Sequence, residues 1–134
     1  MSGFALRKLL GGARRDPAVA DRPIDLVHLS RQSLGDRALE KELLMLFDRQ
    51  AEQIIARLDS EIGNGERKWR RDLSHTLAGS ARAVGALRVA RAASAYEEAL
   101  FSSASDRELK ILRDEMALEV AAARQSLTVL LADG

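Results

Sequence analysis

The sequence predicts an all-α protein, an antiparallel up-down four-helix bundle with an additional short N-terminal helix. Alanine and leucine are abundant while aromatic residues make up only 4% of the chain, which favours packed helices over sheets. Apolar residues recur at alternating steps of three and four in the last third of the chain, which is the seam pattern of a helical bundle. Connections of a few residues between long helices imply antiparallel neighbours.

Breaks between the apolar patterns delimit the expected helices, which span about 24–34, 36–62, 66–81 and 86–101, with a last helix that Ser105 or Asp106 caps. Pro23 introduces the first, because proline at the start of a helix lacks only a donor that would be unpaired anyway. Gly35 ends it, and Asp36 is the N-cap candidate of the next helix. The main apolar stripe of that second helix is expected to comprise Leu39, Leu43, Leu46, Phe47, Gln50, Ile54 and Leu58.

Residues 1–20 are predicted to be a flexible N-terminal tail, and residues 21–134 a single helical domain. The tail holds a short basic amphipathic piece, Phe4 to Leu10, whose apolar run is too short and too charged for a signal peptide or a membrane span. A chain of 134 residues is long enough for one core but not for a two-domain enzyme.

Charge and composition exclude several classes of function. Charged residues make up 31% of the chain but the net charge is only +1, which gives no reason to expect nucleic acid or an anionic membrane as partner. The chain contains no cysteine, so disulfides, thiol catalysis and cysteine-rich metal sites are excluded. Two histidines far apart in sequence leave little prospect of a zinc site, and no metal ligands are predicted.

One of these histidines, His75, is expected to point away from the core of its helix. Successive helical residues lie 100° apart, and this angle places an apolar stripe that includes Leu77 on the opposite side. Gly79 follows His75 by one turn, although glycine inside a helix costs about 1 kcal/mol relative to alanine. This glycine indicates that something large must approach the imidazole; close packing of a neighbouring helix is the alternative. Within about 60° of His75 on the helix lie Lys68, Arg71, Asp72, Ala78, Gly79 and Arg82.

The stretch His75-Thr-Leu-Ala-Gly-Ser-Ala81, followed by Val84-Gly-Ala86, resembles the signature of histidine-containing phosphotransfer (Hpt) domains, H-x-L-K-G-S-[SA]-x-x-x-G-A. Trp69, six residues before the histidine, and Tyr96-Glu97, in the place of a Leu-Glu pair, also fit. The resemblance covers nearly the whole chain, from about residue 24 to residue 131. It departs from the family pattern at Ala78, where the signature has a lysine.

The resemblance implies a phosphorelay protein in which His75 accepts a phosphoryl group from the aspartate of a receiver domain and passes it to another receiver. The implied partners are response-regulator receiver domains and a hybrid sensor histidine kinase in the cytoplasm. No cofactor is expected, because the receiver supplies a magnesium ion. The chain is expected to be a monomer without a nucleotide-binding or kinase domain of its own.

The other candidate site residues have supporting roles. Lys68, Arg71 and Arg82 are expected to place positive charge near the phosphorylated ring; the alternative is a plain solvated basic face. Ser80 is expected to point inward and to bond to the backbone. Gln50 is expected either to lie near the histidine or to be a satisfied core amide. The candidate partner contacts are Met45, Asp72, Ala78 and Gly79, and Met45 is equally well explained as an isolated apolar surface residue.

Other functions stay open at this point. The main alternative is a non-catalytic helical adaptor that binds a receiver domain without phosphotransfer, prompted by Ala78, and a generic bundle scaffold comes third. An ATP-dependent kinase is disfavoured, because nothing resembles a glycine-rich nucleotide lid. A general-base or metal enzyme would need a second acid or ligand near His75. The other histidine, His28, is expected to be an ordinary exposed residue.

Overall fold

The computed structural model describes residues 22–59 and 67–132, and these residues form five α-helices. A short helix precedes four long ones: α3 (Leu26–Ser33), α4 (Arg37–Asp59), α5 (Arg67–Val84), α6 (Leu87–Phe101) and α7 (Asp106–Ala132). The described residues contain no β-strand, so the predicted all-α class is confirmed. The predicted tail, residues 1–20, lies outside the described residues, and the division of the chain at residue 21 stays a prediction.

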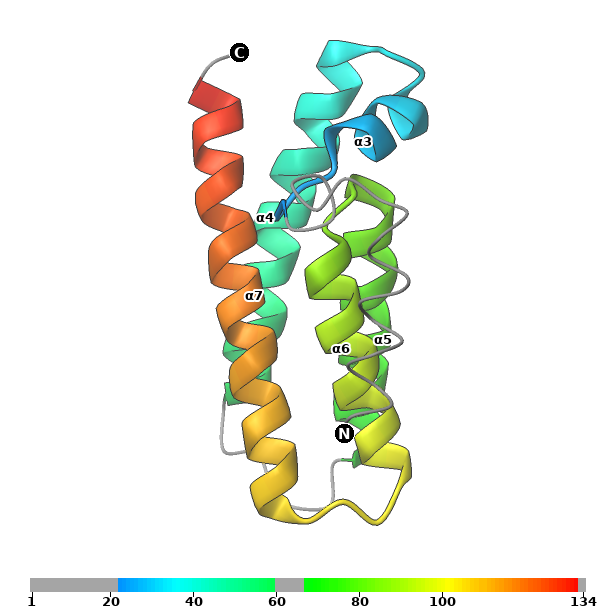
Figure 1. Cartoon of the computed structure of the whole chain (residues 1–134), viewed down its shortest axis with the longest axis vertical. Coiled ribbons are helices and arrows are strands. Elements are labelled where there is room, and N and C mark those ends of the chain that lie inside the picture. The colour runs from blue at the N-terminus through cyan, green and yellow to red at the C-terminus, as the bar shows by residue number, and fades with distance from the viewer. Residues whose placement is uncertain (1–21, 60–66, 133–134) are drawn as a thin grey trace, which may run out of the picture.

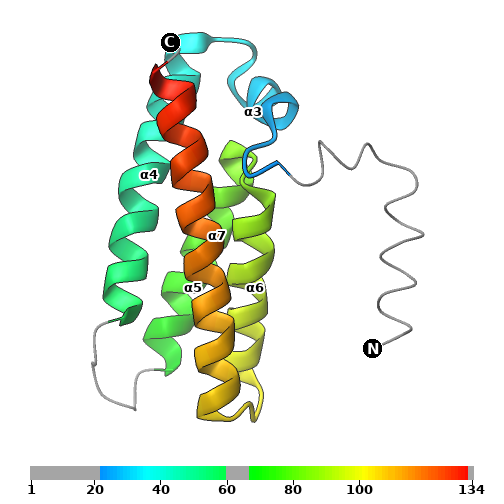
Figure 2. The same cartoon turned by 60° about the vertical axis from the view of Figure 1, so that its left-hand side comes forward.

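The four long helices lie side by side and alternate in direction (Figures 1 and 2). In Figure 1, α4 descends from the end that carries α3, α5 returns to that end, α6 descends again and α7 returns. Each long helix contacts two others: α4 contacts α5 and α7, and α6 contacts the same two helices. The short α3 packs against α4 and α5. The predicted up-down bundle with an extra N-terminal helix is therefore confirmed.

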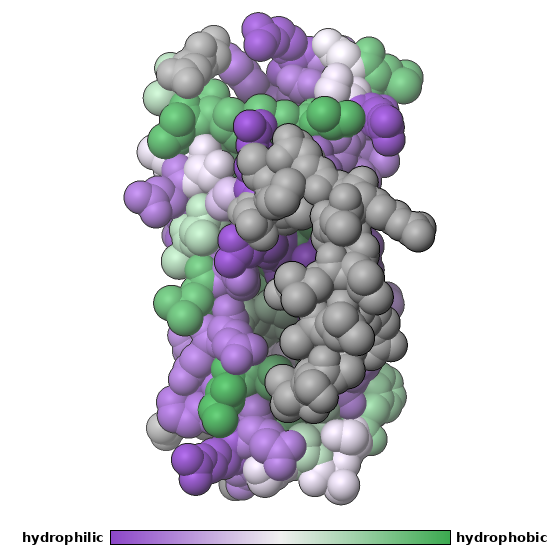
Figure 3. All heavy atoms as spheres, in the orientation of Figure 1, coloured by the Kyte–Doolittle hydropathy of each residue, from purple (hydrophilic) through white to green (hydrophobic). Residues whose placement is uncertain are grey.

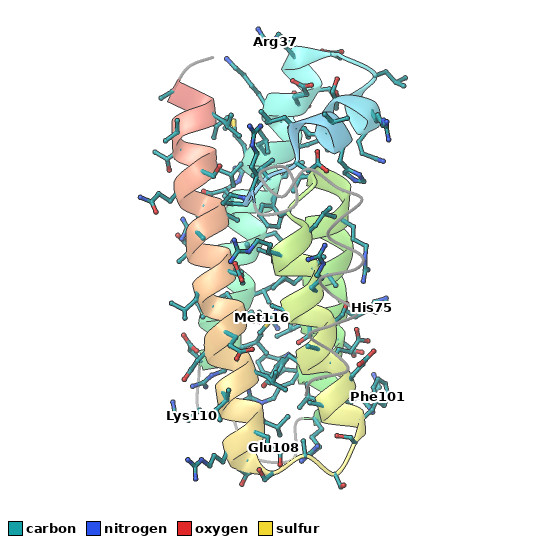
Figure 4. All side chains as sticks on the ribbon, viewed as in Figure 1. Arg37, His75, Phe101, Glu108, Lys110 and Met116 are labelled. Carbon is teal, nitrogen blue, oxygen red and sulfur yellow. The ribbon has the colours of Figure 1, made fainter. Side chains whose placement is uncertain are left out.

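The core consists of apolar residues that recur at steps of three and four. On α7 they are Met116, Val120, Ala123 and Leu127, and Figure 4 labels Met116 on the face of α7 that meets the other helices. Full burial of a side chain the size of Met116 stabilises the fold by about 1.5–3 kcal/mol. Alanines such as Ala81 on α5 and Ala93 on α6 are completely buried. Their small side chains allow α5 and α6, which share the most extensive interface, to approach closely.

Two expected core positions on α4 are wrong. Leu39 is 39% exposed and Leu46 is 56% exposed, whereas Leu44 and Phe47 are buried. The buried residues of α4 follow the spacing 44, 47, 51, 54 and 58. Because α4 packs between α5 and α7, the positions of these two helices select which side is buried, and a stripe centred on Leu43 and Leu46 lies too far round the helix.

Arg124 links α7 to α4 through two carboxylates. Its Nε donates to Asp48 Oδ1 at 2.7 Å and its Nη2 donates to Glu52 Oε2 at 2.6 Å. The pKa of Arg124 lies above its ordinary value, chiefly because the guanidinium donates to the Asp48 carboxylate, which favours the charged form more than burial disfavours it. This link fixes the seam between the first and last helices of the bundle.

The turn between α5 and α6 is held by α3. Gly85 has a φ of +79°, a left-handed conformation that favours glycine. Its carbonyl oxygen accepts a hydrogen bond of 2.8 Å from the Asp25 backbone N–H. A Cβ built on Gly85 would lie 2.6 Å from the Asp25 backbone oxygen. The Gly-Ala pair of the sequence signature is therefore a docking point for the start of α3.

We expect Gly85→Ala to lower the free energy of unfolding by about 2 kcal/mol or more, measured by urea unfolding. The left-handed backbone costs alanine about 1–2 kcal/mol, and the Cβ must also push the Asp25 backbone away. Gly35→Ala is the matched control, because Gly35 has the same φ of +79° but its Cβ would meet nothing within 4 Å. Equal losses in the two variants would show that the contact with Asp25 contributes nothing.

Candidate functional site

His75 lies on α5, on the side of the helix that faces solvent. Its side chain is 75% exposed. Figure 4 shows His75 on the edge of the molecule that lies away from α7, and Phe101 lower on the same edge. The outward orientation that helical spacing predicted for His75 is therefore present in the structure, and a large partner can reach the ring.

Glu97 of α6 binds the His75 ring across the helix pair. Its Oε2 lies 3.2 Å from His75 Nδ1 and its Oε1 lies 3.4 Å away. A carboxylate only accepts hydrogen bonds, so Nδ1 carries the proton and donates. In the neutral ring the lone pair then resides on Nε2, the other nitrogen. The sequence places Glu97 in a family motif but gives no indication of its contact with His75, because the two residues lie on different helices; the Glu97 side chain is 22% exposed.

Gly79 leaves open space one helical turn after His75. A Cβ built on Gly79 would meet nothing within 4 Å, and the residue is exposed. Close packing of another helix of this chain therefore does not explain the glycine within the described residues. The space beside the imidazole is free for a partner, which favours the interpretation that Gly79 provides access.

Two arginines on the same side of α5 as His75 are each held by a residue of α6. Arg71, one turn before His75, stacks its guanidinium 4.1 Å from the centre of the Phe101 ring. Arg82, two turns after His75, donates from Nη2 to Ser94 Oγ at 2.9 Å. The later of the two arginines on α5 contacts the earlier of the two partners on α6, as expected for antiparallel helices. The His75–Glu97 contact lies between these two pairs, so one seam between α5 and α6 orders all three.

The sequence model of the Hpt domain family matches residues 42–132, which is more than half of the chain. The chain belongs to the Hpt domain family. Comparisons with curated proteins and with solved structures gave no match. Hpt domains have a phosphotransfer role in two-component signalling and interact with the receiver domains of response regulators. Among the described helices of this Hpt domain, none is both long enough and apolar enough to cross a membrane.

Lys68 and Asp72 lie on the predicted face but bind each other. Lys68 Nζ lies 3.1 Å from Asp72 Oδ2, one turn apart on α5, and both side chains are exposed. Such exposed pairs stabilise a helix by about 0.3–0.5 kcal/mol. The surroundings of the Hpt histidine are therefore of mixed charge, with a carboxylate in direct contact with the ring, and are less basic than the sequence predicted.

Ser80 and Gln50 meet each other rather than the histidine. Ser80 Oγ donates to Gln50 Oε1, which joins α5 to α4, and both residues are half-buried. The predicted bond from Ser80 to backbone is therefore replaced by a bond to a side chain. Met45 on α4 is exposed, as predicted, and its role as a partner contact stays a prediction.

Ala78 does not lie on the exposed face, and its prediction as a partner contact is wrong. Its side chain is only 1% exposed and belongs to the core. A helical wheel places Ala78 within about 60° of His75, but α6 packs closely along that side of α5 and covers it. The position where the Hpt signature has a lysine is thus an alanine inside the seam between α5 and α6.

His28 is not the ordinary exposed residue that the sequence predicted. It is half-buried, and its Nε2 donates to the backbone carbonyl of Arg82 in the last turn of α5. A carbonyl oxygen only accepts hydrogen bonds, so the ring nitrogen is the donor. The Asp25 side chain caps α3 by accepting from the His28 backbone N–H at 3.1 Å. His28 therefore fastens α3 to the helix that carries His75.

The described part of the chain contains no cluster of three or more histidine, cysteine, aspartate or glutamate residues that could hold a metal ion. His75 and Glu97 form a pair, and the remaining neighbours of the ring on α5 are cations, Asp72 and Gly79. This arrangement can present a neutral imidazole with a defined tautomer to an incoming electrophile.

Proposed function

We propose that this Hpt domain carries phosphoryl groups in a two-component phosphorelay. His75 accepts a phosphoryl group from the phosphoaspartate of one receiver domain and gives it to the aspartate of another. The observation that carries the proposal is the hydrogen bond from His75 Nδ1 to Glu97, because it directs the nucleophilic lone pair of the neutral ring to the exposed Nε2.

The proposed step is an in-line displacement. The Nε2 lone pair attacks phosphorus, the bond from phosphorus to the aspartate oxygen breaks, and its electron pair leaves on the receiver carboxylate. The ring then holds a phosphoryl group on Nε2 and a proton on Nδ1, so it carries a positive charge. Glu97 faces that charge and stabilises it. The reverse step, onto a second receiver, returns the electron pair to Nε2 and restores the neutral ring.

The other residues around His75 provide access for the receiver domain and positive charge near the transferred phosphoryl group. Gly79 leaves room for the receiver's acidic pocket to surround the imidazole. Arg71 and Arg82 flank His75 along α5, where they can contact the receiver or the transferred phosphoryl group. The receiver supplies the phosphoaspartate, a magnesium ion and a lysine, so we propose no cofactor for this chain. A hybrid sensor histidine kinase, a monomeric state and a cytoplasmic location complete the proposal.

Transfer from a phosphorylated receiver tests the proposal directly. A receiver domain labelled with radioactive phosphate on its aspartate is mixed with this protein, and label should appear on the protein within minutes in an acid-labile form. Binding of the receiver without labelling would favour the adaptor function instead. If no receiver of the source organism binds or labels the protein, only the function of a helical scaffold remains.

Glu97→Ala should slow phosphotransfer by roughly 2–10-fold, the effect of losing one hydrogen bond of about 0.5–1.5 kcal/mol. Without Glu97 the neutral ring is free to carry its proton on Nε2, which removes the nucleophilic lone pair from the exposed nitrogen. Glu97→Gln keeps an acceptor oxygen at this position and should recover most of the rate. Transfer rates from a phosphorylated receiver measure both effects.

Glu98→Ala is the matched control for Glu97→Ala, because Glu98 is the next residue on α6, carries the same charge and is exposed. Its variant should transfer at the parental rate. If Glu98→Ala slowed transfer as much as Glu97→Ala, the loss of negative charge would be the cause. The role of the hydrogen bond in selecting the tautomer would then be wrong.

A further inference from the structure

A cavity of about 320 Å³ lies at the lower end of the bundle, where α5 and α7 begin and α6 ends. Figure 3 shows that the surface over the first turns of α7 is mostly hydrophilic, and Figure 4 labels Lys110 there. The polar groups of the lining are the side chains of Arg67, Arg70, Tyr96, Asp106, Lys110 and Arg113. Four of these six are cations, whereas one is a carboxylate.

Two of the cations are fixed by the ends of helices. Arg67 donates from Nη1 to the Leu100 carbonyl at 3.1 Å, in the last turn of α6. Arg70 donates from Nη1 to the Leu58 carbonyl at 2.9 Å, in the last turn of α4, and to the Tyr96 hydroxyl at 3.4 Å. Each guanidinium has five N–H donors, so these bonds orient both groups and leave further donors on each.

Arg113 has a donor without a hydrogen-bond acceptor. Among the described residues, its Nε is the buried side-chain nitrogen or oxygen atom that lacks a hydrogen-bond partner. The nearest carboxylates are Asp59, with Oδ1 3.7 Å from that Nε, and Asp114, with Oδ1 3.6 Å from Nη2. Both distances are too long for hydrogen bonds. That Nε has almost no accessible surface, so a ligand in the cavity can meet only the rest of the Arg113 guanidinium. The Arg113 side chain is 27% exposed and both carboxylates lie beyond hydrogen-bond distance, so its Nη donors remain available to an acceptor that belongs to a ligand.

We propose that this cavity binds a small molecule that carries a phosphate group. Phosphate oxygens accept paired hydrogen bonds from guanidinium groups, which match them in geometry and charge. Arg113 would give its Nη donors, and Arg70 and Lys110 would add donors from α5 and α7. A volume of about 320 Å³ lies at the lower end of the range of small-molecule sites, about 300–1,000 Å³.

The cavity is separate from the phosphotransfer surface. Arg70 precedes His75 by five residues, which places it about 140° further round α5. The proposal therefore stands or falls independently of phosphotransfer by His75. A bound ligand would join the first turns of α5 and α7 to the end of α6, and it would stabilise the lower end of the bundle.

Isothermal titration of the full chain with inorganic pyrophosphate, at about 0.15 M ionic strength, tests the proposal. We expect saturable binding of one pyrophosphate per chain and weaker binding of inorganic phosphate. Arg113→Gln should raise the Kd by about tenfold or more, because it removes a lining guanidinium whose Nη donors have no other hydrogen-bond acceptor within the described residues. Lys110→Gln, at an exposed position that does not affect folding, should raise the Kd several-fold.

Arg91→Gln is the control, because Arg91 is an exposed arginine of α6 outside this cavity and its variant has the same change of charge. It should bind pyrophosphate like the parent. Absence of saturable binding to the parent would overturn the proposal. So would equal weakening by Arg91→Gln and Lys110→Gln, which would indicate a diffuse attraction to the net charge.

Discussion

His75→Gln should fold like the parent and should accept no phosphoryl group from a phosphorylated receiver. The side chain is mostly exposed and makes one contact, with Glu97, so its replacement removes little packing. Glutamine is a good helix former and keeps the propensity of α5. A glutamine amide has no nucleophilic nitrogen, so acid-labile labelling should be lost completely. Circular dichroism and the transfer assay measure the two halves of this expectation.

His28→Gln is the matched control. It removes the other histidine of the chain, which lies on α3 and fastens that helix to the Arg82 carbonyl. Losing that hydrogen bond should lower the free energy of unfolding by about 0.5–1.5 kcal/mol, yet labelling of His75 should persist. Label that survives in His75→Gln and disappears in His28→Gln would overturn the assignment of the phosphoacceptor.

Helical periodicity was sufficient to predict the bundle and the exposure of His75 and Gly79. Both depend on angles within a single helix, and the apolar stripe around Leu77 defines the centre of the buried side of α5. The N-cap at Asp36 was also predictable, because Asp36 Oδ1 accepts from the Leu39 N–H within one turn. Local geometry and a strong amphipathic pattern lead to the same result at these positions.

The contacts between helices were beyond the reach of that reasoning. The Glu97 contact depends on how far α6 is shifted along α5, and a single sequence does not contain that register. The burial of Ala78 was unpredictable for the same reason. Its angular position on the helical wheel of α5 is compatible with exposure, and only the close approach of α6 buries it. His28 depends on a contact with a residue 54 positions away, which no local pattern reveals.

The sequence nevertheless contained signals for part of the seam between α5 and α6. Small residues on both α5 and α6, such as Ala81 and Ala93, allow the close approach that buries Ala78. Once Glu97 is paired with His75, antiparallel geometry places Phe101 beside Arg71, four residues further along α6 and four residues back along α5. A single correct pair would therefore have predicted the second one along the same seam.

Gly79 is a position on α5 at which effects on stability and on function can be separated. Its Cβ would meet nothing within 4 Å, so a side chain there would cause no clash inside the described part of the chain. A glycine inside a helix is less favourable than most residues by up to about 1 kcal/mol. Replacement should therefore stabilise the fold, and any loss of activity must come from the space that the new side chain occupies beside His75.

Gly79→Gln should raise the free energy of unfolding by up to about 1 kcal/mol and slow phosphotransfer by on the order of 10–100-fold. The glutamine side chain lies one turn from the imidazole, where it would keep the receiver's phosphoaspartate from reaching Nε2 in line. Urea unfolding and the transfer rate from a phosphorylated receiver measure the two effects. Ala83→Gln adds the same side chain at an exposed position of α5 two turns from His75, and it should transfer at the parental rate. A Gly79→Gln protein that is more stable and equally fast would show that the open space beside the histidine has no role in transfer.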